Sequence, residues 1–401
     1  MVLYNSLLDG LQNLLYEVHL EEQPPQLSFK KWCKRHPKWG SRDRKLVGKA
    51  LFDSLRWKRR YCWCMNTESL NRENLTELLW VWSVLEDISW KTPPTGKFPS
   101  ASEIKARDKN GKKHPKIAHA IPDWLDALGS AHYPETWQEE CAAFNTPAPL
   151  ILRVNTLKTS KTALQQQLEK EGIVTTPIAH YPYALKCEQN ARVTSTKAYQ
   201  KGFFEIQDAN SQKVAEWIAP EKGHVIFDVC AGAGGKTLHL ATQLQNTGQV
   251  FAMDANPKKL EILQKRAMRN GLQNIVVPQE IDNAFQAQWQ KQVNAVLIDS
   301  PCSGLGVLRR HPEHKWIMHP QRIKALNEVQ EHLLQTHSNW VKPKGHLCYA
   351  TCSILPSENE NQIDRFLQSN TGQQFKLIKA ETMLTHTTGN DGFFIAKLQR
   401  Q

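Results

Sequence analysis

HVIFDVCAGAGGKTLHLATQL, residues 224–244, is the stretch that decides the fold of this chain. It begins with a short apolar run, continues with glycines at positions 232, 234 and 235, and ends in an apolar helical pattern. Glycines in a strand-to-helix turn let a ligand approach the backbone, and the free N–H groups of the helix start favour an anionic group. The stretch therefore predicts a strand, a turn and a helix with a ligand site at the turn.

Four further apolar runs follow this turn and alternate with helical segments. They are QVFAMD at 249–254, NIVVP at 274–278, AVLIDS at 295–300 and HLCYAT at 346–351. Short strands that alternate with helices are typical of a parallel sheet covered by helices on both faces. We predict a Rossmann-like, doubly wound α/β domain over residues 201–401.

The turn suits an adenosine-containing cofactor, although a purely structural turn is the alternative. Asp254 follows Gly234 by 20 residues, where a carboxylate accepts hydrogen bonds from both ribose hydroxyls. Thr237 takes the place of the third glycine of the dinucleotide pattern, which disfavours a nicotinamide cofactor. S-adenosylmethionine lacks a pyrophosphate but offers a carboxylate to the turn. Asp282, after the third strand, is placed to meet the adenine amino group.

Two cysteines are expected at the carboxyl edge of the same sheet. DSPCSG places Asp299 and Cys302 after the fourth strand, and TCS places Cys352 after the next one. Open α/β sheets bind their ligands at this edge. A buried structural role is the alternative for either cysteine alone. Their shared position beside an adenosine site favours a chemical role for both.

Two thiols suit the methylation of carbon 5 of cytosine, because that carbon is too electron-poor to attack a methyl sulfonium. A thiolate that adds to carbon 6 makes carbon 5 enamine-like, and loss of the carbon 5 proton later expels the thiol. Asp299 is the candidate acid at ring nitrogen 3, or it orients a proton shuttle. Lys236 and Arg310 are candidate charges that favour the thiolate. The residues alone do not decide which cysteine attacks.

Five ordered motifs make the chain resemble the RsmB/NOP (Fmu-like) family of RNA 5-methylcytosine methyltransferases. The motifs are RVNTLKTS at 153–160, FFEIQDANSQ at 203–212, DVCAGAGGKT at 228–237, DSPCSGLG at 299–306 and YATCSILPSENE at 349–360. The resemblance implies a class I methyltransferase domain with S-adenosylmethionine as cofactor. It also implies that Cys352 is the nucleophile and that Cys302 assists product release. The cofactor contacts that it implies are Cys230, Ala231, Gly232, Ala233, Gly234, Gly235, Lys236, Asp254, Asp282 and Asp299.

Residues 1–118 are predicted as a helical region with a linker, and they resemble the NusB-like amino-terminal domain of some family members. Apolar side chains at positions 7, 8, 11, 14, 15 and 18 form the stripe of an amphipathic helix. Helical runs follow at 45–57 and 74–88. Residues 90–115 are rich in Pro, Gly, Lys and Ser, which predicts a linker or long exposed loop.

The stretch KWCKRHPKWGSRDRK at 31–45 interleaves cations with Trp32 and Trp39. Such a pattern favours contacts with RNA phosphates and stacking on bases. A solvated basic face with two core tryptophans is the alternative.

Residues 119–200 are predicted as a small α+β module. LILRVNTL at 150–157 reads as a strand, and a helix follows through Leu164 and Leu168 before Gly172. The resemblance implies an RRM-like arrangement that binds RNA.

Three departures from the family pattern stand out. The cofactor turn carries Ala233 where relatives have proline, which loosens the turn without removing a hydrogen-bond donor. RRHPEHKW at 309–316 replaces the usual arginine-asparagine-proline-aspartate, and the loop that carries Asp282 matches poorly.

Composition restricts partners and location. The 401 residues include 51 Lys and Arg against 39 Asp and Glu, a formal charge of +12, which favours a polyanionic partner. We expect RNA as that partner, and the resemblance points to ribosomal RNA. The sequence shows neither a membrane-spanning run nor a signal peptide, so a cytoplasmic location is expected. We also expect a monomer. The nine cysteines indicate no disulfide framework, and no metal site is expected at Cys62 and Cys64.

Two rival functions remain at this point. A noncatalytic RNA-binding ribosome-assembly factor could keep the fold without turnover, but the presence of Asp299, Cys302 and Cys352 argues against it. A nicotinamide-dependent oxidoreductase is disfavoured by the missing glycine and by the two thiols.

Overall fold

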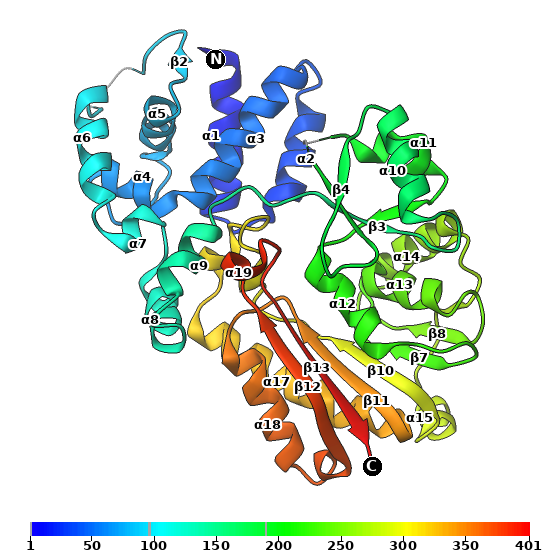
Figure 1. Ribbon diagram of the computed structural model, residues 1–401. Coiled ribbons are helices and arrows are strands. Elements are labelled where there is room, and N and C mark those ends of the chain that lie inside the picture. Colours follow the sequence, from blue (N-terminus) through cyan, green and yellow to red (C-terminus); the bar gives the residue numbers. More distant parts are fainter. Residues whose placement is uncertain (1, 95–97, 189–190) are drawn as a thin grey trace. The chain divides into compact units, whose positions relative to one another are not determined.

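The computed structural model describes residues 2–94, 98–188 and 191–401 (Figure 1). The chain divides into two compact units. The first unit comprises Met1–Thr146 and Leu308–His319, and the second comprises Pro147–Val307 and Pro320–Gln401. Each unit is described in turn, beginning with the second, because it contains the predicted cofactor turn and both cysteines.

A seven-stranded sheet forms the centre of the second unit, in the order β12-β13-β11-β10-β7-β8-β9. The five strands from β11 to β9 are parallel, whereas β13 runs antiparallel to both β11 and β12. The doubly wound, Rossmann-like sheet of the prediction is therefore confirmed. The strands are β7 (Val225–Asp228), β8 (Gln249–Ala252), β9 (Ile275–Val276), β10 (Val293–Asp299), β11 (Val341–Thr351), β12 (Phe375–Met383) and β13 (Phe393–Arg400).

Helices cover both faces of this sheet because alternate strand residues point to opposite sides. Ile226 packs in one apolar cluster with Leu238, and its neighbour Phe227 packs in the other with Leu334. The helices are α12 (Ala209–Ile218), α13 (Gly235–Gln243), α14 (Pro257–Asn270), α15 (Asn283–Trp289), α17 (Pro320–His337), α18 (Glu360–Gln368) and α19 (Thr385–Thr388). The short 3₁₀ turns are η2 (Leu305–Val307), η3 (Ser338–Trp340), η4 (Pro356–Glu358) and η5 (Gly372–Gln374).

A smaller antiparallel sheet, in the order β4-β5-β3-β6, precedes the large one in the sequence and confirms the predicted α+β module. The predicted strand and helix are present as β3 and α10, and Gly172 follows with a φ of 78°. The elements of this part are β3 (Ile151–Val154), α10 (Lys161–Lys170), β4 (Thr175–Pro177), β5 (Ala184–Cys187), η1 (Val193–Ser195), α11 (Lys197–Gln200) and β6 (Phe204–Ile206).

The first unit is helical, as its amphipathic pattern predicts. Leu7, Leu11, Leu14 and Leu15 are buried in the core of the unit, and Leu8 packs against that core. The helices are α1 (Asn5–His19), α2 (Pro25–Arg35), α3 (Ser41–Arg56), α4 (Lys58–Met65), α5 (Leu75–Leu85), α6 (Ala101–Gly111), α7 (Pro115–Ala118), α8 (Asp123–His132), α9 (Trp137–Ala143) and α16 (His314–Ile317). The strands β1 (Val2–Leu3) and β2 (Ser89–Trp90) pair in parallel.

The predicted linker at 90–115 is wrong over much of its length, because α6 occupies Ala101–Gly111. Ser100 and Glu103 form a capping box that starts this helix, and Ile104 is fully buried on it. Asp108 of α6 pairs with Arg60 at 2.5 Å, which binds the helix to α4. Residues 95–97 of the predicted linker lie outside the described residues.

Residues 119–146 pack with the first unit, whereas the sequence analysis placed them at the start of the α+β module. Arg59 of α4 donates to the Ile121 carbonyl at 2.6 Å and to Asp123 at 3.0 Å, and Arg56 donates to the Phe144 carbonyl at 3.0 Å. The division at 118 and 200 remains a prediction about domains. Every helix in the part of the chain that the structure describes is too short or too polar to cross a bilayer.

Candidate functional site

The glycine-rich turn between β7 and α13 has the open backbone that a ligand requires. Gly232 and Gly234 have φ values of 54° and 90°, in the left-handed region that favours glycine. A Cβ at Gly234 would lie 2.7 Å from Cγ of Leu263, whereas a Cβ at Gly232 would meet no described atom within 4 Å. The backbone at Gly232 therefore faces open space, while Gly234 is needed for close packing against α14.

Asp254 lies where the sequence analysis expects a ribose-binding carboxylate. Its Oδ2 accepts from the Gly232 N–H at 2.8 Å, which joins the end of β8 to the turn. A cavity of about 480 Å³ begins beside it and is lined by Met253, Leu260, Val277 and Ile281 among others. Largely apolar walls with the carboxylates of Asp254 and Glu261 suit the adenosine part of a cofactor.

Asp282 has a local role in this structure. Its carboxylate is exposed and accepts from the Phe285 N–H at 2.8 Å, capping the start of α15. The nearby side chains of Gln279 and Ile281 line the adenosine cavity, whereas Asp282 is absent from its lining. A contact between Asp282 and the cofactor remains a prediction. It requires the Asp282 carboxylate to leave its position at the start of α15 and turn toward the cavity.

Asp228, at the end of β7, is a site residue that the sequence reasoning missed. Its Oδ2 accepts from the Thr237 hydroxyl at 2.7 Å, while Oδ1 is buried and has no hydrogen-bond partner among the described residues. Burial, together with the charge of Asp299, raises the pKa of Asp228 to about 7. An orphaned carboxylate oxygen beside the turn fits the ammonium group of a methionine moiety. Its position at the carboxyl end of the first strand was the available signal.

The turn, the cavity and the Asp228 carboxylate together fit S-adenosylmethionine. The backbone at Gly232 is open to the carboxylate of the methionine part, Asp228 to its ammonium group, and Asp254 to the ribose. The described residues therefore supply a partner for each polar end of that cofactor.

Cys302 and Cys352 meet at the carboxyl edge of the large sheet, with their sulfur atoms 3.3 Å apart. They meet because β10 and β11 are parallel neighbours, with Asp299 paired to Ala350. Both cysteines are partly exposed. The hydrogen bond to Cys352, followed by burial and the negative charge of Cys352, raises the pKa of Cys302 well above its ordinary value. Either sulfur can be the donor of this hydrogen bond, and the raised pKa favours the protonated form of Cys302.

Lys236 and Asp299 form an ion pair beside these thiols, with Nζ 2.6 Å from Oδ2. Burial alone would lower the pKa of Lys236, but the negative charges of Asp299 and Cys352 raise it above its ordinary value. A stable cation is therefore within electrostatic range of the Cys352 sulfur. Arg310, the other candidate cation, belongs to the first unit and is not placed relative to the thiols.

Glu358, which follows the TCS motif, connects the two loops that carry the cysteines. Its fully buried carboxylate accepts from the Ser303 N–H at 2.8 Å and from the Ser303 and Ser353 hydroxyls at 2.5 Å each. The Gln330 amide donates a fourth hydrogen bond at 3.1 Å. Each serine directly follows one of the two cysteines, so this carboxylate fixes the spacing of the two thiols.

The basic stretch of the first unit keeps its charges at the surface but not its tryptophans. Trp32 and Trp39 are buried, and His36 stacks against both rings, with centroid distances of 5.3 and 4.3 Å. The expectation that these rings stack on bases is therefore wrong for this conformation, because they form part of the core. The cations that remain exposed are Lys30, Lys31, Lys34, Arg35, Lys38, Arg42, Arg44 and Lys45.

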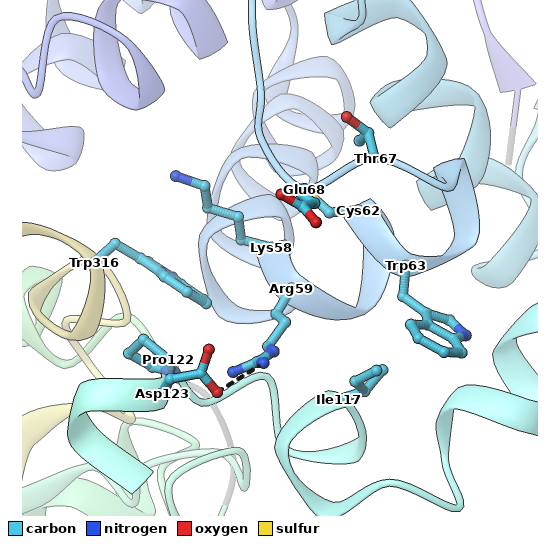
Figure 2. A pocket seen from close by; sticks show the side chains of 10 residues that line it. All are labelled: Lys58, Arg59, Cys62, Trp63, Thr67, Glu68, Ile117, Pro122, Asp123 and Trp316. Atoms are coloured by element: carbon cyan, nitrogen blue, oxygen red, sulfur yellow. Dashed lines mark hydrogen bonds and ion pairs between the residues drawn. The ribbon is translucent and has the colours of Figure 1, made fainter. Parts of the chain in front are cut away.

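The first unit contains a separate cavity of about 530 Å³ (Figure 2). Figure 2 shows the Arg59 guanidinium directed at the Asp123 carboxylate, and Lys58 lies 5.5 Å from the centroid of the Trp316 ring. Its lining holds two cationic and two acidic side chains, Glu68 being the second acid. This balance of charge gives the cavity no preference for a phosphate backbone.

The divergent stretch RRHPEHKW belongs to the first unit, where it packs on α2 and on the end of α3. Glu313 accepts from Gln26 at 3.3 Å and pairs with His311 at 3.2 Å. Lys315 donates to the Arg56 carbonyl at 2.8 Å, and Trp316 donates to the Leu55 carbonyl at 2.5 Å. Ligand atoms of His311, Glu313 and His314 lie within 4.8 Å of one another, as in a possible metal site. His311 and Glu313 already bind each other, and Glu313 also binds Gln26, so these contacts hold the stretch on α2.

Comparisons with known proteins identify one family of RNA methyltransferases. A family model described as 16S rRNA methyltransferase RsmB/F matches residues 215–399, and a model of the RsmF/B-like ferredoxin-like domain matches residues 121–194. Ribosomal RNA small subunit methyltransferase B of Vibrio cholerae serotype O1 is 34% identical over 305 residues, covering 73% of this chain and 68% of that protein. Its namesake from Escherichia coli O6:K15:H31 is 35% identical over 288 residues, covering 69% and 66%. The chain thus spans about two thirds of the length of these curated relatives.

Solved structures show the same fold at lower identity. The structure of PH0851 is 21% identical, covers 98% of both chains and has a TM-score of 0.78. The structure of NSun6 from Pyrococcus horikoshii with SFG is 20% identical, covers 70% of this chain and 99% of that one, and has a TM-score of 0.64.

Proposed function

The chain belongs to the RsmB/F family of S-adenosylmethionine-dependent RNA methyltransferases, and we propose that it methylates carbon 5 of a cytosine in ribosomal RNA. The observation that carries this proposal is the pair of sulfur atoms, Cys302 and Cys352, 3.3 Å apart at the ligand edge of the sheet. Methylation of an exocyclic amine or of a ribose hydroxyl needs no thiol nucleophile, whereas carbon 5 of cytosine must first be activated by a thiolate that adds to carbon 6, and a second thiol beside the first can assist product release.

The residues around the turn hold the cofactor in this proposal. S-adenosylmethionine supplies an electrophilic methyl group when it is bound. Asp254 binds the ribose, and Asp228 with the turn from Cys230 to Lys236 binds the methionine part. Asp299 is paired with Lys236, so both side chains lie at the edge of the sheet where the cofactor and the cytosine base are proposed to bind.

Cys352 is the proposed nucleophile. Cys352 is partly exposed, and its sulfur lies 3.3 Å from the sulfur of Cys302 and within range of the Lys236 cation. Its thiolate adds to carbon 6 of cytosine, forming a carbon–sulfur bond while ring nitrogen 3 gains a proton. The Lys236–Asp299 pair is assigned to that edge of the base, where it supplies the proton or orients the group that does.

Cys302 is the proposed proton carrier for product release. After carbon 5 has gained its methyl group, its remaining proton must leave before the bond between carbon 6 and Cys352 breaks. The electrons of the carbon 5–hydrogen bond then restore the ring double bond, and the sulfur of Cys352 departs as a thiolate. Cys302 is 3.3 Å from that sulfur, and its raised pKa favours the thiol form, so it first gives its own proton to solvent and then accepts the carbon 5 proton. The proton on ring nitrogen 3 returns to the Lys236–Asp299 pair as the sulfur of Cys352 leaves.

RNA binding is assigned to both units. The exposed cations at 30–45 supply a surface for the phosphate backbone, and the ferredoxin-like module precedes the catalytic sheet. The small-subunit rRNA named for the relatives is the proposed substrate. A noncatalytic assembly factor would also bind RNA, so methyl transfer itself is the discriminating measurement.

The test is methyl transfer from labelled cofactor to small-subunit rRNA, with the product nucleoside identified by mass spectrometry. Cys352→Ala should give no 5-methylcytosine, and Cys302→Ala should accumulate a covalent protein–RNA adduct that resists denaturing gels. Cys33→Ala, which changes a partly buried thiol of the first unit, is the control and should match wild type. Equal activity of all the variants would refute the thiol mechanism.

A further inference from the structure

Two arginines donate hydrogen bonds to backbone carbonyls of the cofactor turn. Arg266 of α14 donates from Nη1 to the Ala233 carbonyl at 2.5 Å. Arg153 of β3 donates from Nη1 to the Gly235 carbonyl, also at 2.5 Å. Two alternate carbonyls of the turn are thus each held by a guanidinium group.

Both arginines are themselves fixed by the ferredoxin-like module. Arg153 on β3 is the cross-strand partner of Glu205 on β6. Glu205 is 2% exposed and pairs with Arg266 at 2.8 Å and also with Arg269. Arg153 is equally buried and shares its Nη1 with the Gln207 side chain at 2.5 Å. Buried cations persist only where they are paired and hydrogen-bonded, so these positions are tightly determined.

We propose that Arg153 and Arg266 are positioning residues that hold the cofactor turn in its binding shape. Peptide planarity gives the reason. Fixing the Gly235 carbonyl also fixes the orientation of the Lys236 N–H, and fixing the Ala233 carbonyl does the same for the Gly234 N–H. A turn with two residues at positive φ and no proline otherwise has many conformations to lose on binding.

The alternative is that the arginines only neutralise Glu205. Arg269 separates the two roles, because it pairs with the same carboxylate but makes no described contact with the turn. Arg266 and Arg269 lie on the same helix, α14, three residues apart. They therefore form a matched pair that differs in the contact with the Ala233 carbonyl.

The experiment compares Arg266→Met with Arg269→Met by calorimetric titration of the RNA-free protein with S-adenosylmethionine. We expect Arg266→Met to weaken binding about 5- to 20-fold, the loss of one charge-assisted hydrogen bond. Arg269→Met should change it less than about 2-fold by the same scale. Hydrogen exchange of the amides at 232–236 in the cofactor-free protein should accelerate only for Arg266→Met. Equal effects of the two substitutions, or no effect of either, would overturn the proposal.

Stiffening the turn with a proline tests the mechanism directly. Ala233→Pro in the Arg266→Met background should recover most of the lost affinity, because the ring restricts the turn without needing the guanidinium group. A merely structural role of Arg266 would leave the double variant as weak as the single one. If Arg266→Met does not fold, Arg266→Lys serves in its place, since a lysine cannot contact Glu205 and Ala233 together as a guanidinium does.

The inference rests on the cofactor assignment of the proposed function, but the two fail differently. Wild-type protein that does not bind S-adenosylmethionine would refute the cofactor assignment. Affinity for S-adenosylmethionine that is reduced equally in both arginine variants would refute only the positioning role of Arg153 and Arg266.

Discussion

Replacement of Glu358 by glutamine should disturb the spacing of the two thiols while both cysteines remain in the chain. In wild type the carboxylate accepts four hydrogen bonds, two at Oε1 and two serine hydroxyls at Oε2. In Glu358→Gln the amide oxygen can keep the two bonds at Oε1. The amide nitrogen must face the hydroxyls of Ser303 and Ser353, which have to rotate and become acceptors.

The magnitude follows from that exchange. Two hydrogen bonds to a charged acceptor, each contributing about 1.5–3 kcal/mol, become neutral ones of about 0.5–1.5 kcal/mol. The free energy of unfolding should therefore fall by about 2 kcal/mol. The turnover rate should fall further, by about 100-fold, because a displacement of about 1 Å in a reacting group has an effect of that order.

The assay combines urea unfolding with single-turnover methyl transfer at a temperature where the variant is folded. Glu360→Gln is the matched control, two residues along the chain, because its carboxylate accepts a hydrogen bond from Thr382 and contacts neither serine in the described structure. We expect this control to lose about 1 kcal/mol or less and to keep its turnover rate. Glu358→Gln that is as stable and as active as Glu360→Gln would refute the role of the carboxylate.

Three further predictions follow from buried charges and from the basic surface. The pKa of Asp228 is raised to about 7, so the folded cofactor-free protein keeps a proton that the unfolded chain releases, and its free energy of unfolding should fall as the pH rises from about 4 to 7. In urea unfolding, Asp228→Asn should lack this dependence of the unfolding free energy on pH. Burial lowers the pKa of Lys315 to about 7, so stability should rise with pH from about 7 to 10, and Lys315→Met should abolish that rise. Changing Lys34, Lys38 and Arg42 to glutamine should weaken RNA binding in filter assays and reduce the slope of log affinity against log salt by about 2 to 3; an unchanged slope would exclude this surface.

The fold of the second unit could be predicted because its signals are local. Each strand is a short apolar run, and the glycines at 232 and 234 take up the positive φ values that the turn requires. The meeting of Cys302 and Cys352 could also be predicted, because the carboxyl ends of neighbouring parallel strands share an edge. The apolar periodicity and the order of the strands are therefore enough to predict the sheet and the meeting of the two cysteines, and no distant side-chain contact has to be known.

Features that depend on distant partners could not be predicted in the same way. The bond from Arg153 to the Gly235 carbonyl joins residues 82 positions apart, and nothing local to RVNTLKTS indicates it. Trp32 and Trp39 carry the composition of a base-stacking surface, but their stacking on His36 is a tertiary fact. The start of α6 is a different case, because the sequence does contain its capping box, Ser100 and Glu103. The Pro, Gly, Lys and Ser content of the surrounding stretch pointed to a linker instead.

The position of Glu358 also bears on which thiol stays protonated. Its negative charge is among the causes that raise the pKa of Cys302, after the hydrogen bond to Cys352, burial and the charge of Cys352. The group that fixes the spacing of the two loops therefore also favours the thiol form of the cysteine assigned to release. Glu358→Gln removes that charge, so the pKa of Cys302 should fall, and release should reach its half-maximal rate at lower pH than in wild type. A variant with slower turnover but an unshifted pH profile of adduct breakdown would limit Glu358 to holding the loops together.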